Sequence, residues 1–347
     1  MRENLKKYLK KGRVIREKKE IVIKTKEERK ERGMIRYIVK RVLMMIPVLL
    51  GVTLLIFTLL YFADGDPARN LIGADATEEE IQALRAEWGL DDPYFVRYGR
   101  YLKQLLIDRD LGTSYVTKQN ISTEIISRFK VTFLVAVEST VLALVFGTVL
   151  GIVAATHQNT WLDNSSMVAA LVGASMPGFW IGLVLSIIFA LKLRILPASG
   201  WGTFAQTILP SLSLAITSAG TLARQTRSSM LEVIRQDYIV TAKAKGVSQF
   251  KVVYVHALRN ALIPIVTSAG MQLSWLIGGA VVTETVFSIP GLGMYMVTAI
   301  NQRDYPVIQG SVLYMAFAFS IVMLLVDILY AFIDPRIKAK YKNAKKA

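Results

Sequence analysis

The stretch VTFLVAVESTVLALVFGTVLGIVAA, from Val131 to Ala155, carries a single acidic residue and no lysine or arginine. A helix rises 1.5 Å per residue, so about 20 apolar residues cross the ~30 Å hydrocarbon core of a bilayer. The whole chain has the same character, because 53% of its 347 residues are hydrophobic and its mean hydropathy is +0.40. These values are too apolar for an ordinary soluble domain and predict an all-α membrane protein.

Six apolar segments have close to the length of a membrane-spanning helix. They are Val42 to Phe62, Val131 to Ala155, Met167 to Leu191, Thr207 to Ala223, Ile265 to Phe287 and Ser311 to Ile333. The fourth is short and rich in serine and threonine, and it places Ser211, Ala215, Ala219 and Ala223 four residues apart. Such a stripe of small residues lets helices approach closely, so we expect this segment inside the bundle. A re-entrant or interfacial segment is the alternative.

Lysine and arginine predict the orientation, since they are enriched in cytoplasmic loops. With six spans, the basic N-terminal tail, the loop from Arg224 to Pro264 and the basic C-terminal tail all lie on one side. The 68-residue segment from Ala63 to Lys130 then lies outside, with 12 acidic and nine basic residues. We therefore predict that both termini are cytoplasmic.

The charged ends set the outer divisions of the chain. Residues 1–41 hold 17 lysines and arginines and six glutamates, and we interpret residues 1–33 as a disordered charged extension. A basic tail beside a first span is typical of a topology determinant, and no nucleic-acid recognition fold accompanies it. The charged region is too long for a cleavable signal peptide, and Met34 would make a sensible start. The other divisions are a first span (34–62), an extracytoplasmic cap (63–130), the main transmembrane domain (131–338) and a basic tail (339–347).

The outer segment has a helical pattern of its own. We expect Pro67 to end the first membrane helix, a helix to run from Thr77 to Trp88, and Gly89 to stop it. Thr77 followed by Glu80 fits a capping box. A second helix is predicted from Pro93 to Ile107, and the near-helical spacing of Trp88, Tyr94, Tyr98 and Tyr101 favours a folded cap over a spacer. Such a cap is a natural docking surface for a soluble partner.

Motifs for enzymatic chemistry are absent from the sequence. It contains no cysteine, no G-x-x-x-x-G-K-[ST] phosphate loop and no H-E-x-x-H pair. His157 and His256 both fall in predicted loops, where a solvated surface role is favoured. We therefore expect no catalytic residue, no metal site and no ATP hydrolysis by this chain alone.

Three carboxylates fall inside apolar segments, namely Glu138, Glu284 and Asp327. Each would cost about 2.5–3.5 kcal/mol at the centre of a bilayer, so such groups usually face a pore, a partner or a helix end. Glu138 and Glu284, together with Ser211, are candidates for lining a translocation path. An interhelical hydrogen bond is an equal alternative for the two glutamates and the favoured one for Asp327.

The loop from Arg224 to Pro264 holds seven lysines and arginines against two acidic residues. Its composition predicts a helix from Ser228 to Lys245, a stop at Gly246, and a second helix from Ser248 to near Asn260, before Pro264. A helix–glycine–helix unit makes a rigid hairpin that can seat in a groove of a partner and transmit a push. A solvated hairpin that stabilises topology is the alternative.

Taken together, several short runs resemble the inner-membrane permease subunits of ABC importers for dipeptides and oligopeptides, the DppB/OppB-like family. The resemblance covers about residues 34–338, and the order and spacing of the runs are more specific than any one of them. They are GDPA (65–68), GLDDP (89–93), DLGTSY (110–115), SMPGFWIGL (175–183), LPASGW (196–201), TAKAKG (241–246), HALRNALIP (256–264), ETVFSIPGLG (284–293) and RDYPVIQG (303–310).

The resemblance implies that the TAKAKG region is the loop whose coupling helix docks on an ATPase subunit. The residues that would form this contact are Asp237, Tyr238, Ala242, Ala244, Lys245 and Gly246. Thr241 stands where the general importer motif has glutamate, as is common in peptide-type permeases. The resemblance also implies a bacterial or archaeal cytoplasmic membrane and four kinds of partner besides the lipid bilayer. These are a second homologous permease, two ATPases that carry ATP and Mg, an extracytoplasmic solute-binding protein and a peptide substrate.

The predicted function is therefore that of half of the translocation pathway of an ATP-driven peptide importer. Permeases for nickel–chelate complexes or glutathione are closely similar and stay open as alternatives. A secondary proton-coupled transporter, with Glu138 and Glu284 as proton sites, is the alternative from another class. Against it are the lack of an evident inverted repeat and the small number of spans.

Overall fold

The computed structural model describes residues 36–73 and 76–333, and its regular elements are all helices within those residues. An isolated bridge between Thr113 and Asn120 is the only β pairing there. The all-α prediction is therefore confirmed, whereas the extension (1–33) and the basic tail (339–347) lie outside the described residues. The elements are a first helix (Arg36–Tyr61), α2 (Pro67–Ile72), α3 (Glu78–Trp88), α4 (Tyr94–Leu106), α5 (Ile121–Thr156), α6 (Trp161–Ser175), α7 (Gly178–Leu185), the π-helical η1 (Ser186–Lys192), α8 (Phe204–Ile234), α9 (Asp237–Ala244), α10 (Gln249–Lys251), the π-helical η2 (Val252–Ala257), α11 (Leu258–Gly279), α12 (Val281–Val286), α13 (Leu292–Gln302) and α14 (Tyr305–Ile333).

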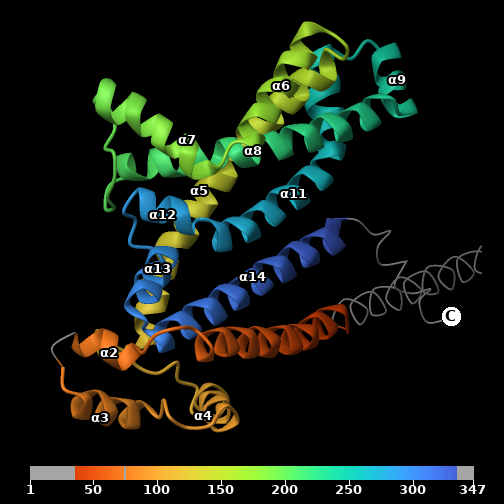
Figure 1. Ribbon diagram of the computed structural model, residues 1–347. Coiled ribbons are helices and arrows are strands. Elements are labelled where there is room, and N and C mark those ends of the chain that lie inside the picture. Colours follow the sequence, from red (N-terminus) through yellow and green to blue (C-terminus); the bar gives the residue numbers. More distant parts are fainter. Residues whose placement is uncertain (1–35, 74–75, 334–347) are drawn as a thin grey trace, which may run out of the picture. The chain divides into compact units, whose positions relative to one another are not determined.

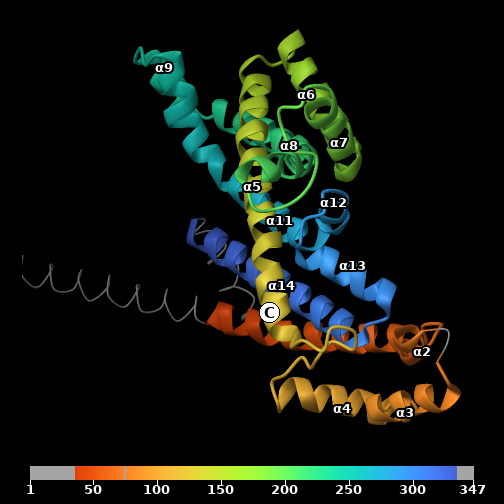
Figure 2. The same ribbon diagram turned by 90° about the vertical axis from the view of Figure 1, so that its left-hand side faces the viewer.

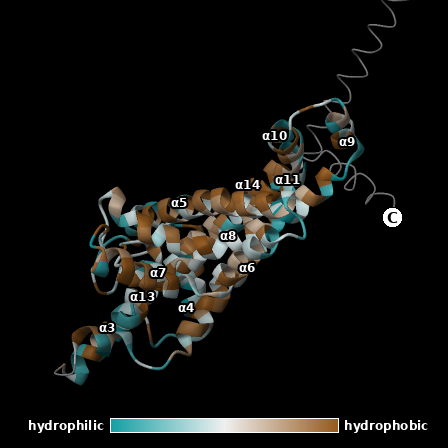
Figure 3. Ribbon diagram, turned by 90° about the horizontal axis from the view of Figure 1, so that it is seen from above, coloured by the Kyte–Doolittle hydropathy of each residue, from teal (hydrophilic) through white to brown (hydrophobic). Residues whose placement is uncertain are grey.

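Residues Leu49–Ile333 form one compact unit, and its central element is the 36-residue helix α5. This helix packs against α6, α8, α11, α13 and α14 (Figure 1). In both ribbon views α9 lies toward one end of α5 and the helices α2–α4 lie toward the other (Figure 2). Apolar residues dominate α5 and α14, and polar residues gather around α3 and α10 (Figure 3). The predicted cap and the predicted hairpin therefore lie at opposite ends of this unit.

Four of the described helices are long and apolar enough to cross a membrane. They are Arg36–Tyr61, Ile121–Thr156, Gln249–Gly279 and Tyr305–Leu329. The pair formed by Trp161–Ser175 and Gly178–Lys192 would be a fifth span if its two halves are counted together. These helices confirm a membrane protein of several spans. Six spans remain a prediction, because α8 is too polar to be recognised by length and composition.

The third predicted span, Met167 to Leu191, is not a straight helix. Its two halves meet at an angle of 102°. Pro177 disfavours a helical conformation at the residue before it, and Met176 is accordingly extended, with φ −95° and ψ 137°. α6 therefore ends at Ser175, and Pro177 immediately precedes α7.

The fifth predicted span, Ile265 to Phe287, is broken as well. α11 ends at Gly279, after two consecutive glycines, and α12 begins at Val281. Glycine is a poor helix former, which explains a break at this point. The chain then forms α13, which the hydropathy pattern does not predict because its 11 residues are too few to span a bilayer.

The small-residue stripe of α8 packs as predicted, at the centre of the helix bundle. Fifteen of the 31 residues of α8 are buried, and Ser211, Ala215, Ala219 and Ala223 are among them. A Cβ atom on Gly147 of α5 would lie 2.8 Å from the carbonyl oxygen of Ala219, and one on Gly151 would lie 2.7 Å from that of Ala223. Small residues on both helices therefore allow backbone-to-backbone contact, and the interior position of this segment is confirmed.

The outer segment is folded, and the first of its two predicted helices, α3, begins and ends as predicted. Thr77 caps α3 in a full capping box with Glu80, and Gly89 ends that helix in the left-handed conformation with φ +62°. The predicted second helix corresponds to α4. The prediction for Pro67 is wrong, since the first helix ends at Tyr61 and Pro67 begins α2, where the Asp66 side chain caps the amide of Ala68.

The tyrosines of α4 pack on the first helix. The rings of Tyr94 and Tyr98 lie 5.3 and 5.2 Å from that of Phe57. Their hydroxyl oxygens lie 2.7 Å from Thr58 Oγ1 and 3.1 Å from Thr53 Oγ1. This packing rules out a mere spacer, whereas docking of a soluble partner on the cap stays a prediction.

Asp66 should make the cap sensitive to acid. Burial by itself raises the pKa of Asp66, but hydrogen bonds from Arg85 Nη1 (2.7 Å) and the Ala68 amide (2.9 Å) outweigh it and lower that pKa below 3.8. The folded state then binds fewer protons than the unfolded state, so this contribution to stability is present above pH 3.8 and is lost as the pH falls through the lowered value. We expect Asp66→Asn to flatten the dependence of the thermal unfolding midpoint on pH in this acidic window. Equal slopes for both proteins would contradict the assignment.

Candidate functional site

The hairpin between α8 and α11 differs in its helix bounds from the prediction. The predicted helix from Ser228 to Lys245 is two helices, because α8 continues to Ile234 and the chain turns at Arg235 and Gln236 before α9. The second predicted helix does not end near Asn260, since one helix runs from Gln249 to Gly279 with Pro264 inside it. Burial of Ala261 and Ile265 on either side of Pro264 favours the continuous helix over the break that proline usually causes. The hairpin proper is therefore residues 235–248, carried by two long helices.

One side of α9 is anchored. Ile239 is fully buried in an apolar cluster with Ile152 of α5, Met230 of α8 and Val253 of η2. Ala242 is half-buried against the same cluster. Burying an isoleucine side chain contributes about 1.5–3 kcal/mol, which is enough to hold a helix of eight residues that would be marginal alone. The helix α9 is therefore attached to both long helices and to α5.

The end of α9 is fixed by Gly246. Its amide donates to the carbonyl oxygen of Lys243 (3.0 Å), and the Val247 amide donates to that of Ala242 (3.2 Å). These two bonds form a Schellman motif, which needs a left-handed residue at the position of Gly246, where φ is +76°. The glycine stop predicted from the sequence is confirmed, and it sets the direction in which the chain leaves α9.

The other side of α9 is open to solvent. The side chains of Asp237, Tyr238, Ala244 and Lys245 are exposed, and Gly246 is exposed beside them. The Tyr238 hydroxyl accepts a hydrogen bond of 2.9 Å from Asn260 Nδ2, which ties the exposed edge of α9 to α11. Five of the six predicted coupling residues are therefore available to a partner, whereas Ala242 supports the hairpin from within.

Large exposed apolar side chains on α9 and on the helix that follows the hairpin lie outside the set of predicted coupling residues. Val240 is 59% exposed and Phe250 is 69% exposed. The ring of Phe250 lies 4.6 Å from that of Tyr254, which is also exposed. The sequence does place these large apolar residues in a basic loop. The same residues could equally have formed a buried face, so the sequence alone did not single them out. We name Val240, Phe250 and Tyr254 the hairpin patch.

The three candidate path residues form two interhelical contacts. Ser211 of α8 donates a hydrogen bond of 2.9 Å to Glu138 of α5. Glu284 of α12 is fully buried. Its carboxylate accepts hydrogen bonds from Thr132 Oγ1 of α5 at 2.6 Å and from the Met294 amide of α13 at 3.0 Å. The structure therefore shows Glu284 in an interhelical hydrogen bond, and a path-lining role for Glu138, Ser211 and Glu284 stays a prediction.

Glu284 also explains two glycines of the ETVFSIPGLG run. A Cβ atom at Gly291 would lie 2.4 Å from the Glu284 carboxyl carbon, and one at Gly293 would lie 2.8 Å from Oε2. Thr132 completes the connection, since its hydroxyl oxygen accepts from the Leu292 amide at 2.9 Å. The carboxylate thus joins α12, α5 and the start of α13.

Removing this carboxylate is expected to destabilise the protein. Glu284→Ala leaves the Met294 amide and the Thr132 hydroxyl without their acceptor in a buried place, which costs about 2 kcal/mol. Glu284→Gln keeps one carbonyl oxygen and should lose less. The thermal unfolding midpoints of the purified variants in detergent check the order, and an unchanged midpoint for Glu284→Ala would contradict this role.

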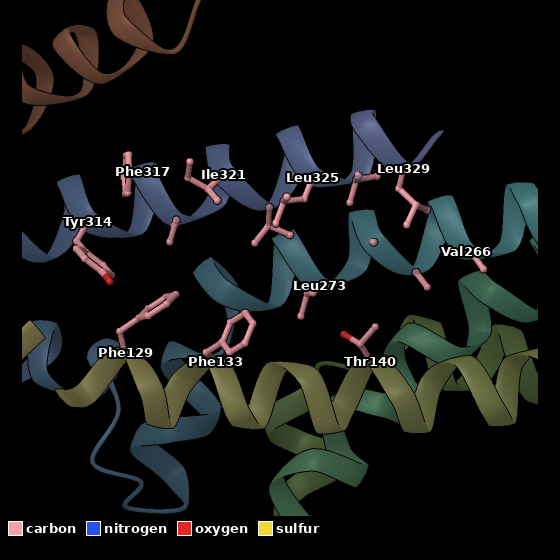
Figure 4. Close-up of a pocket in the computed structure, with 15 residues that line it drawn as sticks. Phe129, Phe133, Thr140, Val266, Leu273, Tyr314, Phe317, Ile321, Leu325 and Leu329 are labelled. Carbon is pink, nitrogen blue, oxygen red and sulfur yellow. The ribbon is translucent and has the colours of Figure 1, made fainter. Parts of the chain in front are cut away.

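An apolar groove of about 530 Å³ lies between α5, α11 and α14. Phe129, Phe133 and Thr140 reach it from α5, opposite Tyr314 and Phe317 of α14 (Figure 4). Its walls offer no charged side chain, so this groove does not suit a peptide with two charged ends. Among the described residues no group of three or more metal-ligating side chains is present.

Comparison with known proteins agrees with this architecture. The model of the family "Binding-protein-dependent transport system inner membrane component" matches residues 147–339, and its N-terminal companion matches residues 34–136. The dipeptide transport system permease protein DppB of Alkalihalophilus pseudofirmus is 43% identical in an alignment of 333 residues, which covers 88% of this chain and all of that protein.

Two glutathione transport system permease proteins, both GsiC, are similar to the same degree. The protein of Salmonella paratyphi A is 44% identical and that of Escherichia coli K12 is 41% identical, each over 307 residues. Both alignments cover 88% of this chain and all of the relative. The chain therefore belongs to the family of binding-protein-dependent transport system inner membrane components, as its sequence motifs predicted.

Proposed function

We propose that this chain is the permease subunit of an ATP-driven ABC importer and forms half of a path for dipeptides and oligopeptides. A second homologous permease would supply the other half, and two ATPase subunits would bind ATP and Mg. An extracytoplasmic solute-binding protein would deliver the substrate. The similarity to a dipeptide permease over 88% of the chain supports the peptide substrate.

The observation that carries the proposal is the attachment of α9. This short helix is anchored through Ile239 on one side and exposes Tyr238, Val240 and Ala244 on the other. Since α8 and α11 leave the hairpin as long helices, a displacement of α9 by a partner would move both of them as rigid elements. ATP-bound closure of the ATPases would drive this displacement and open the path outward, and hydrolysis would return it.

The proposed orientation follows from the same hairpin. ATPases are in the cytoplasm, so the hairpin, both termini and the basic tails would lie there, and α2–α4 would lie outside. This places the folded outer segment where a solute-binding protein can dock. The membrane is then a bacterial or archaeal cytoplasmic membrane.

Glutathione is the second candidate substrate, because the two GsiC proteins are as similar to this chain as the dipeptide permease is. Glutathione is itself a tripeptide, so one path could serve both substrates. Competition between labelled dipeptide and unlabelled glutathione, measured with each candidate binding protein, separates the two assignments. A nickel–chelate complex is tested in the same assay.

The test of the proposal is uptake by proteoliposomes that hold both permeases and both ATPases, with binding protein and ATP. Uptake should require the ATPases, and Ala244→Asp, which changes only the exposed side of α9, should lower it at least ten-fold. Ala242→Asp is less informative because Ala242 also packs inside the hairpin. Uptake that persists without ATPases and follows a proton gradient would instead support a secondary transporter.

A further inference from the structure

A second groove, of about 860 Å³, lies between α6 and the last three turns of α8. Its polar wall carries Arg224 and Arg227 from α8 and Arg235 from the turn that follows it, and its apolar wall is formed by Met167 and Leu171 from α6 with Leu231 from α8. The volume is in the range of pockets that hold a drug-sized ligand. A place with one cationic wall and one apolar wall suits a molecule that is anionic at one end and apolar at the other.

The three arginines are unequal in their bonding. Arg227 holds the buried Asp163 by two hydrogen bonds of 2.7 Å, from Nε and Nη2. A guanidinium has five N–H donors, so Arg227 is fixed in place and keeps three of them for a further acceptor. Within the described residues Arg224 makes no hydrogen bond or ion pair, and Arg235 makes one bond of 3.5 Å to Gln158.

The charge of the groove is positive. Glu232 is the one acidic residue of its lining, against three arginines. Even when Asp163 beneath Arg227 is included, one positive charge remains. Arg224 and Arg235 are both exposed, so their charges are available to an anion that enters from outside. Guanidinium groups match the oxygens of a phosphate or a carboxylate with two parallel hydrogen bonds.

The position of the groove matches the level of lipid headgroups. α6 starts with Trp161, which is 75% exposed, and exposed tryptophans are enriched at the boundary between membrane and water. Further along α6, Val168, Leu171 and Val172 are 60%, 55% and 47% exposed, which gives an apolar strip leading away from the arginines. An acyl chain can lie on this strip while its phosphate reaches the arginines.

We propose that this groove binds an anionic phospholipid, with the phosphate on Arg224, Arg227 and Arg235 and the acyl chains along α6. Basic pockets between membrane helices on the cytoplasmic side are known to hold such headgroups. The inference uses the inward orientation of the hairpin from the proposed function. A bound lipid would brace the cytoplasmic end of α8 beside the hairpin that α8 carries.

The experiment is native mass spectrometry of the purified full-length chain, titrated with phosphatidylglycerol or with zwitterionic phosphatidylethanolamine. The wild type should retain phosphatidylglycerol at least ten-fold better. The double variant Arg224→Gln with Arg235→Gln should lose roughly thirty-fold in affinity for phosphatidylglycerol, since each basic residue near a membrane surface contributes about 1 kcal/mol, or a factor of about five. Neither arginine has an ion pair in the described residues, so the variant should keep its thermal unfolding midpoint.

The control is Arg109→Gln with Lys130→Gln, which removes two exposed charges outside the groove and should leave the lipid preference intact. Equal retention of both lipids by the wild type, or an unchanged preference in the Arg224 and Arg235 variant, would overturn the proposal. Displacement of phosphatidylglycerol by millimolar inorganic phosphate, by a dipeptide or by an acidic peptide would assign the groove to that ligand and would also overturn the proposal. No ATPase, ATP or substrate enters the titration, so its outcome is independent of whether the chain imports peptides.

Discussion

Replacing both Val240 and Phe250 by glutamate is expected to abolish ATP-driven uptake while leaving the protein folded. Both side chains are mostly exposed and belong to the hairpin patch, so the change costs the isolated protein little. In an interface with an ATPase the same two positions would have to bury unpaired charges. Truncating a central apolar anchor of an interface typically costs about 2 kcal/mol or more, so loss of both predicts at least a hundred-fold weaker association.

The measurement is co-purification of the ATPases with the permease, followed by uptake in proteoliposomes. Phe95→Glu is a matched control for the co-purification, because Phe95 lies on α4 and is 82% exposed, so it makes the same kind of change far from the hairpin. Normal ATPase association by the Val240 and Phe250 variant would show that coupling does not use this patch. The predicted residues Asp237, Tyr238, Lys245 and Gly246 would then have to be tested one by one.

The second large effect is expected from Gly220→Leu in α8. A Cβ atom at Gly220 would lie 2.1 Å from the carbonyl oxygen of Ala170 and 2.7 Å from the Cβ atom of Ala174, both on α6. The nearest obstacle is backbone, so a side chain cannot be accommodated by a rotamer change and the two helices must separate. We expect a loss of about 3 kcal/mol, at the upper end of the usual cost of overpacking, and poor yield of folded protein.

The matched control for Gly220→Leu is Gly278→Leu. Gly278 lies within α11, and an added Cβ atom there meets nothing within 4 Å. Leucine is a better helix former than glycine, so this variant should be as stable as the wild type or slightly more so. Size-exclusion profiles and thermal unfolding midpoints compare the two. Equal stability of both variants would mean that α6 and α8 do not pack as closely as described.

The hairpin shows how far local sequence signals reach. Gly246 was recognised as a helix stop because a left-handed position at a helix end depends on the nearest residues only. The break at Arg235 and Gln236 was missed, since the composition from Ser228 to Lys245 is helical throughout. That break depends on where Ile239 finds its buried cluster, and Ile152 of that cluster lies 87 residues earlier in the chain.

Glu284 shows what single-sequence reasoning leaves open. Its position in an apolar run indicated that the carboxylate needs a partner, but it could not choose between a path and another helix. The partner, Thr132, is 152 residues away along the chain, and only the packing of α5, α12 and α13 brings the two together. The same packing explains why residues 291 and 293 are glycines, since a Cβ atom at either position would clash with Glu284. In the sequence, Gly291 and Gly293 are recognised only as part of a motif.

The membrane class, the positions of the long helices, the capped outer helix and the family follow from the sequence alone. Each depends on the length of an apolar run, on a turn residue or on a short contiguous motif, all of which are local properties. The hydrogen-bond partners of the buried Glu284 and the arginine groove between α6 and α8 were decided by tertiary structure. They arise where helices distant in sequence compete to bury the same surfaces, and no local pattern records which pairing has the lowest free energy.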